Sequence, residues 1–135
     1  MKVEGGCYCG QVRYEAELQP LLKLQCHCRE CQYITGGGPN FTMGVPKDGF
    51  RYTKGAPKSF TRDDLEIAVT RQFCGNCGTH LATVTPRRPE MVLLKVGSLD
   101  DPAVFEGPQA AIFTIDMQPF HMIRDGLPSF ERRPG

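Results

Sequence analysis

The sequence predicts a mainly β protein with little helix. Two observations carry this prediction. Short stretches with alternating or β-branched residues recur along the 135-residue chain, and each is bounded by turn-forming residues. The chain also contains 15 glycines and 11 prolines, which suit many short strands joined by tight turns better than long helices.

The first expected strand covers residues 11–17, QVRYEAE, where Val12, Tyr14 and Ala16 alternate with polar residues. The stretch MVLLKVG, residues 91–97, is an apolar run between turn signals and indicates a buried strand. Further strands are expected at residues 21–25, 41–45, 51–55, 58–61, 66–73, 80–85 and 111–115.

Helix is expected at two places only, and each is short. Residues 29–35 can form one helical turn, which TGGGPN ends because three glycines and a proline do not continue a helix. A second turn is expected within SLDDPAVF, residues 98–105. Cys7 and Cys9 are expected to lie in an N-terminal loop, and GLPSFERRPG is expected to be an irregular tail.

The size, charge and hydrophobic pattern of the chain indicate which classes of protein it can belong to. We expect one domain over residues 1–135. A formal charge of +1, with no strong basic cluster, does not indicate nucleic-acid binding. The N-terminus has no apolar signal-peptide region, and no stretch approaches the roughly 20 apolar residues of a membrane span. We therefore expect a cytoplasmic protein without membrane contact, in which cysteines serve metal binding or catalysis.

Four of the seven cysteines form two pairs with the spacing of metal ligands. Cys74 and Cys77 form a CxxC knuckle, and Cys7 and Cys9 form a CxC between glycines. A redox CxxC would open a helix, whereas a strand is expected after Cys77. We predict that Cys7, Cys9, Cys74 and Cys77 bind a structural zinc ion. The alternative is that some of them are buried free thiols.

The other three cysteines, Cys26, Cys28 and Cys31, lie within six residues. Three thiolates and one remaining position are what a catalytic zinc site needs, so we predict a second zinc ion here. In the alternative a histidine closes the site as a fourth ligand. His27 lies between two ligands, so its side chain is expected to point away from theirs, and His80 and His121 are the other candidates.

Five segments together resemble the family of glutathione-dependent formaldehyde-activating enzymes, which shares its domain with centromere protein V. These segments are GGCYCGQVRYEA, CHCRECQ, FCGNCGTHL, VGSLDDP and DGLPSFER. Their order and spacing agree with the family over nearly the whole chain.

The resemblance implies a β-tent fold, in which two antiparallel sheets pack around zinc ligands. It implies the same division of the cysteines between a structural and a catalytic zinc, two ions per chain. It also implies a carbon–sulfur lyase that makes or breaks the bond between a thiol, such as glutathione, and formaldehyde.

The chain differs from the common family pattern at two places. Phe113 and Phe120 stand where the family carries tryptophans, and Gln32 stands where Arg or Lys follows the third cysteine. A cation at that position would suit an anionic substrate such as glutathione. We therefore expect a subfamily that uses another thiol or another small electrophile.

We hypothesise that a substrate thiolate bound beside Cys26, Cys28 and Cys31 attacks a small aldehyde, or that the reverse cleavage occurs. The glycines at 36–38 could donate N–H groups to the ligand, or could only form a turn. Arg29 could pair with a substrate carboxylate, or could be a solvated surface residue. Phe113 and Phe120 could wall the pocket, or could belong to the core.

Two other functions remain open from the sequence. The first is a zinc-stabilised binding module without catalysis, and the second is a thiol sensor in which the three-cysteine cluster oxidises. Metal analysis separates them. Two zinc ions, one of which a chelator removes, would indicate the enzyme. Two inert zinc ions would indicate the binding module. One zinc ion and a disulfide would indicate the thiol sensor.

Overall fold

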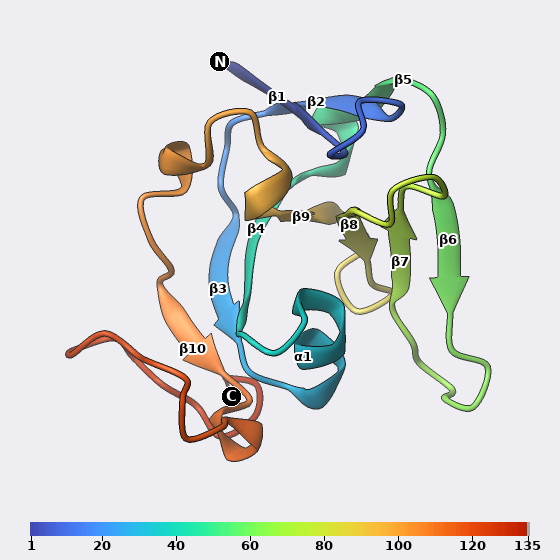
Figure 1. Ribbon diagram of the computed structural model, residues 1–135. Helices are drawn as coiled ribbons and strands as arrows, with labels where there is room; N and C mark the ends of the chain where they lie inside the picture. Colours follow the sequence, from blue (N-terminus) through green and yellow to red (C-terminus); the bar gives the residue numbers. More distant parts are fainter. Residues whose placement is uncertain (135) are drawn as a thin grey trace.

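A computed structural model describes residues 1–134 as two β-sheets with one short α-helix (Figure 1). The smaller sheet has the strand order β1-β2-β5, with β1 Lys2–Gly6, β2 Arg13–Glu17 and β5 Phe50–Lys54. The larger sheet has the order β10-β3-β4-β9-β8-β7-β6. Its strands are β3 Leu22–Cys26, β4 Asn40–Pro46, β6 Lys58–Thr61, β7 Thr70–Phe73, β8 His80–Val84, β9 Met91–Lys95 and β10 Ala110–Ile112. The mainly β prediction with two sheets is confirmed.

The pairing in both sheets is antiparallel except at one edge. There β10 lies parallel to β3, with Ala111 opposite Gln25. The segment after residue 127, which we expected to be an irregular tail, lies against the other side of β10. The Ala111 N–H donates to the Pro128 carbonyl at 2.9 Å, and the Phe130 N–H donates to the Ala111 carbonyl at 2.9 Å.

Cys7 and Cys9 lie in a loop as expected, but the residues before them form strand β1, which the sequence did not indicate. Residues 2–6 pair with β2 although two of them are glycines. A Cβ at Gly5 would lie 2.4 Å from the Tyr14 hydroxyl oxygen and 2.5 Å from the Ser98 carbonyl oxygen. The glycine is therefore needed for close packing, which sequence composition alone does not distinguish from a turn.

The predicted helices are present, and several predicted strands are shorter than expected. Helix α1, Arg29–Thr35, fills the expected range and ends at Gly36 with φ of 82°. The 3₁₀-helix Pro102–Phe105 lies within the second expected turn. Strand β7 begins only at Thr70, and β10 ends at Ile112 because Phe113 adopts a left-handed φ of 54°. None of the helices in residues 1–134 has the length and apolar character that crossing a membrane requires.

The main hydrophobic core lies between the two sheets. The alternation predicted for residues 11–17, which contain β2, is confirmed, because Val12, Tyr14 and Ala16 are all buried in this core. From the larger sheet, the residues that enter it include Met43, Val45, Ala82, Val92 and Leu94. Met43 and Leu94 stand directly opposite each other on β4 and β9, and both are completely buried.

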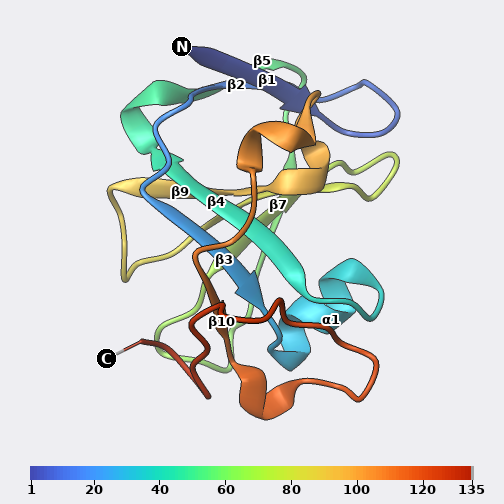
Figure 2. The same ribbon diagram turned by 90° about the vertical axis from the view of Figure 1, so that its left-hand side faces the viewer.

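Part of the opposite face of the larger sheet carries buried polar side chains. Cys26 pairs with Asn40, Thr42 with Lys95, and Arg71 with Thr83. Paired residues, and residues two apart along a strand, point to the same face of a sheet. Helix α1 packs beside the end of β4 on this part of the molecule (Figure 2). The sheet therefore has one face that stabilises the fold by apolar burial and another that gathers chemical groups.

The core placement predicts the effect of truncating Leu94. Leu94→Ala should lower the free energy of unfolding by about 2–5 kcal/mol, because it removes a completely buried side chain and leaves a cavity. Leu65→Ala is the matched control, since Leu65 is 45% exposed, and it should change stability by at most about 0.5 kcal/mol. Urea unfolding of the metal-loaded proteins measures both. Equal losses would contradict the placement of Leu94 between the sheets.

Candidate metal centres

The first candidate centre joins the loop after β1 to the turn between β7 and β8. The sulfur atoms of Cys7, Cys9, Cys74 and Cys77 all lie within 4.8 Å of one another. Cys7 and Cys9 Sγ are 3.6 Å apart, and Cys9 and Cys74 Sγ are 3.7 Å apart. The structure thus brings together the four cysteines that the sequence assigned to one site, and these four could hold a metal ion.

Backbone amides point at these sulfurs. The Val12 N–H donates to Cys7 Sγ at 3.2 Å, and the Asn76 and Cys77 N–H groups each donate to Cys74 Sγ at 3.4 Å. Hydrogen bonds from the Thr79 side chain and backbone lower the pKa of the Cys77 thiol to about 5. These contacts stabilise thiolates, and four thiolates are a donor set that fits tetrahedral zinc. The knuckle leads into β8, so the expectation of a strand after Cys77 is confirmed.

The second candidate centre lies where β3 leads into α1. Cys26 ends β3, Cys28 caps α1, and Cys31 lies in the helix, and their sulfurs are within 4.8 Å of one another. The Cys31 N–H donates to Cys28 Sγ at 3.4 Å, and the Asn40 side-chain amide donates to Cys31 Sγ at 3.4 Å. Hydrogen bonds from Cys26 and Cys28 lower the pKa of Cys31 to about 3. These three thiols could also hold a metal ion.

The histidines do not complete this second centre. His27 is completely buried, and its Nδ1 lies 2.9 Å from Nδ1 of His121. The Gln25 side-chain amide lies 3.0 Å from His27 Nε2, and His121 Nε2 lies 2.7 Å from the Gly37 carbonyl. Burial lowers the pKa of His27. The expectation that His27 points away from the thiols is confirmed, and no Cys, His, Asp or Glu of residues 1–134 joins the three as a fourth ligand within the same distance.

A pocket of about 310 Å³ lies between the two centres. On one side Thr79 contacts the four-thiol cluster, with its hydroxyl 3.2 Å from Cys77 Sγ. On the other side Asn40 contacts Cys31. The residues that line it are Ile34, Thr35, Pro39, Asn40, Phe41, Thr79, His80, Lys95, Val96, Gly97 and Ser98.

Lys95 is the pocket residue that sequence reasoning missed. It is 7% exposed, and burial lowers its pKa to about 8, against the opposing effect of the Cys31 thiolate. The signal was present in MVLLKVG, where one lysine interrupts an otherwise apolar strand. A lysine in a strand that is buried on both faces must have its ammonium group inside the protein, where it is rarely found without a function.

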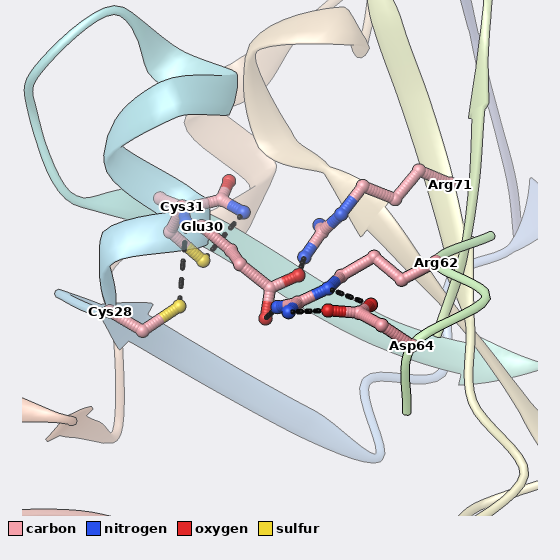
Figure 3. A network of polar contacts seen from close by, with 7 residues as sticks. Cys28, Glu30, Cys31, Arg62, Asp64 and Arg71 are labelled. Atoms are coloured by element: carbon pink, nitrogen blue, oxygen red, sulfur yellow. Dashed lines mark hydrogen bonds and ion pairs between the residues drawn. The ribbon is translucent and has the colours of Figure 1, made fainter. Parts of the chain in front are cut away.

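A second buried cation on the same sheet face has its own partner. Figure 3 shows the Glu30 carboxylate of α1 facing Arg71 and Arg62. Arg71 Nη2 lies 3.0 Å from Glu30 Oε1, and Arg62 Nη1 lies 3.6 Å from Glu30 Oε2. Arg62 also pairs with Asp64 at 2.8 Å. This network ties α1, which carries Cys31, to β7 and to the turn before it.

Gln32 does not face the pocket. It is 4% exposed, and its side-chain amide donates to the carbonyls of His27 at 2.8 Å and Asp116 at 2.9 Å. Its Oε1 accepts from Gln118 at 3.1 Å and also from Arg29. Because this side chain is buried and fully hydrogen-bonded, the lack of a cation at position 32 says nothing against an anionic thiol.

Three other sequence hypotheses are resolved by the contacts. The N–H groups of Gly36 and Gly37 both donate to the Gln32 carbonyl, so these glycines cap α1 and do not offer those N–H groups to a ligand. Arg29 is exposed and lies over the Tyr33 ring at 5.0 Å, as expected for a surface residue.

The two aromatic residues differ in place. Phe113 is partly buried and packs against the small cluster of Cys26, Cys31 and Ile112, whereas Phe120 is 70% exposed. Neither lines the pocket between the two centres. Phe113 therefore belongs to the apolar surroundings of the three thiols, and Phe120 is a surface residue.

Comparison with known proteins identifies the family. The family model named "Glutathione-dependent formaldehyde-activating enzyme", GFA, matches residues 2–116. The chain belongs to the GFA family. The match contains all seven cysteines and every residue of the pocket. The resemblance drawn from the sequence motifs is thus confirmed.

Two further comparisons extend this finding. A curated relative from Halomonas elongata, named "Putative glutathione-dependent formaldehyde-activating enzyme", is 30% identical over 100 residues. This match covers 68% of the present chain and 62% of the relative, so it spans less than two thirds of the relative's length. A crystal structure of a Rhodobacter sphaeroides protein is similar with a TM-score of 0.62 and 19% identity, covering 94% of this chain and 98% of that one. This second likeness shows the fold alone.

The Glu30 network predicts a stability difference between two ion pairs. Glu30→Gln should lower the free energy of unfolding by about 1 kcal/mol, because it removes the charged partner of Arg71, whose side chain is 10% exposed. In the control Glu90→Gln, the pair with Arg88 is half exposed and screened by solvent, so the loss of stability should be clearly smaller. Thermal or urea unfolding measures both. A loss for Glu30→Gln no larger than that of the control would show that Arg71 does not depend on Glu30.

Proposed function

We propose that this GFA-family protein is a zinc-dependent enzyme of the carbon–sulfur lyase class. Its reaction joins a thiol and a small aldehyde into an S-hydroxymethyl adduct, or separates them. The observation that carries the proposal is the cluster of Cys26, Cys28 and Cys31, which has no fourth protein ligand within residues 1–134 and lies next to a pocket.

The donor sets fit two zinc ions in different roles. Cys7, Cys9, Cys74 and Cys77 supply four sulfurs, which complete a tetrahedral structural site. Cys26, Cys28 and Cys31 supply three, as in catalytic zinc sites. Zinc held by three thiolates supplies the capacity to bind a substrate thiol and lower its pKa.

The reaction balances without a redox partner. A substrate thiol loses its proton, its sulfur forms a bond to the aldehyde carbon, and the carbon–oxygen π electrons move to oxygen, which takes up a proton. In the reverse direction the C–S bond breaks and the carbonyl re-forms. The chain's part is to hold the thiol sulfur beside Cys31, where the Asn40 amide already donates to sulfur, and to give the aldehyde room in the pocket.

The name of the Halomonas elongata relative supports glutathione and formaldehyde as the first pair to test. A small thiol is thus the proposed partner, and the buried and fully hydrogen-bonded Gln32 is no obstacle to an anionic one. The reduced thiols that both centres require agree with a cytoplasmic location, which stays a prediction.

The two centres should respond differently to loss of a cysteine. Cys28→Ala should yield a folded, soluble protein that keeps one zinc per chain and loses activity. Cys77→Ala should lose solubility or folding, because the four-thiol cluster connects β1 to the β7–β8 turn. Zinc content by mass spectrometry and circular dichroism measure these outcomes. If Cys28→Ala unfolds as badly as Cys77→Ala, the division into structural and catalytic zinc is wrong.

The activity is measurable by exchange NMR with ¹³C-formaldehyde and glutathione. The zinc-loaded protein should accelerate exchange between free aldehyde and the S-hydroxymethyl adduct by at least about a hundredfold over the uncatalysed exchange, the lower end of what general acid–base catalysis alone contributes. Cys28→Ala is the control, and with this variant the exchange rate should equal the uncatalysed rate. No acceleration with glutathione or with smaller thiols would refute the lyase proposal.

A further inference from the structure

The pocket beside the three-thiol cluster contains a buried cation without a partner. The Lys95 ammonium is subject to burial and to the charges of nearby groups, but it makes no hydrogen bond or ion pair within residues 1–134. Arg71, the other buried cation of the same sheet face, is paired with Glu30. The negative charge that acts on Lys95 comes from the cysteine cluster, chiefly from Cys31. The ammonium therefore keeps its capacity to donate hydrogen bonds to a ligand in the pocket.

The sheet register places this lysine within reach of the thiols. Lys95 is opposite Thr42, Asn40 lies two residues before Thr42, and Asn40 is opposite Cys26. All of these side chains therefore lie on one face of the sheet. The Asn40 amide contacts Cys31 Sγ and also lines the pocket, so the pocket and the thiols are adjacent.

The remaining walls of the pocket fit the rest of a small anionic ligand. None of the lining residues is acidic. His80 also lines the pocket. Ile34, Pro39 and Phe41 give an apolar side that can receive methylene groups. A volume of about 310 Å³ lies at the lower end of the range for ligand pockets, which favours a compact ligand.

We propose that Lys95 binds the carboxylate of the thiol substrate, so that the preferred substrates are small thiols with a carboxylate a few bonds from the sulfur. This inference rests on the proposed function, since it places the substrate sulfur at Cys26, Cys28 and Cys31. The contact is a charge-assisted hydrogen bond from the Lys95 ammonium to a carboxylate oxygen. The covalent step is the one given above and is unchanged.

The test compares an acidic and a neutral thiol of similar size, mercaptopropionate and mercaptoethanol. The full chain is loaded with Co²⁺ in place of zinc, and thiol binding is followed by the sulfur-to-cobalt charge-transfer absorption. Mercaptopropionate should bind wild type about tenfold more tightly than mercaptoethanol, the factor expected from one charged hydrogen bond. In Lys95→Met this preference should disappear while mercaptoethanol affinity changes by less than about twofold.

Lys54→Met is the matched control, because Lys54 is an exposed lysine at the end of β5 in the smaller sheet. It should keep the tenfold preference. Lys95→Met should fold with a thermal stability close to that of wild type, because methionine is a flexible apolar side chain that suits a buried strand position. A strongly destabilised Lys95→Met would reveal a structural role and overturn the proposal.

The other outcomes are also decisive. Equal affinities of the two thiols for wild type overturn this inference and leave the proposed function standing. If Lys95→Met weakens both thiols by the same factor, Lys95 supports the metal centre by its charge and does not bind carboxylate. If neither thiol changes the cobalt spectrum, the proposed function fails, and the inference fails with it. Glutathione in the same assay reports whether a larger thiol with more distant carboxylates gains from Lys95.

Discussion

The larger sheet carries apolar core residues on one face and a group of buried polar residues on the other, and the site depends on this division. Met43 and Leu94 stand opposite each other on one face and pack in the core between the sheets. On the other face the same two strands carry Thr42 and Lys95, and β3 adds Cys26. Because side chains alternate along a strand, the residue-by-residue register that builds the core also fixes which polar groups meet on the far side. A shift by one residue would exchange the two sets.

A buried polar face is stable only where its groups are satisfied, and most of them are. Arg71 is paired with Glu30, Asn40 donates to Cys31, and His27 and His121 bond each other. The same contacts hold α1 and the chain around residue 121 in place around the three thiols. Lys95 is the cation that remains without a partner on this face, and it lies where the pocket meets the thiols. Thr83 Oγ1 and His80 Nδ1 also have no hydrogen-bond partner. Lys95 and His80 both line the pocket, so two of these three residues lie where a ligand has room.

The sequence predicted the fold class, the two cysteine clusters and most strands, because all of these depend on local patterns. Alternation along β2 and ligand spacing in CxC and CxxC are visible without tertiary information. Strand β1 was missed since its glycines serve close packing against Tyr14, a contact made across the sheet. Gln32 was misjudged because helix α1 turns that side chain toward Asp116, 84 residues away in the chain. Lys95 was missed since its burial depends on β4 and β8, the strands that pair with β9 on either side.

The two cysteine clusters differ in a way that follows from where the chain holds them. Cys7 and Cys9 follow β1, and Cys74 and Cys77 join β7 to β8, so four sulfurs from distant segments close on one another and connect the two sheets. Cys26, Cys28 and Cys31 come from one segment, the end of β3 and the start of α1, and no other part of residues 1–134 adds a ligand. Three ligands from this one segment leave one position of a tetrahedral metal site without a protein ligand. The neighbouring strands form a pocket beside this cluster, and Asn40, His80 and Lys95 line it.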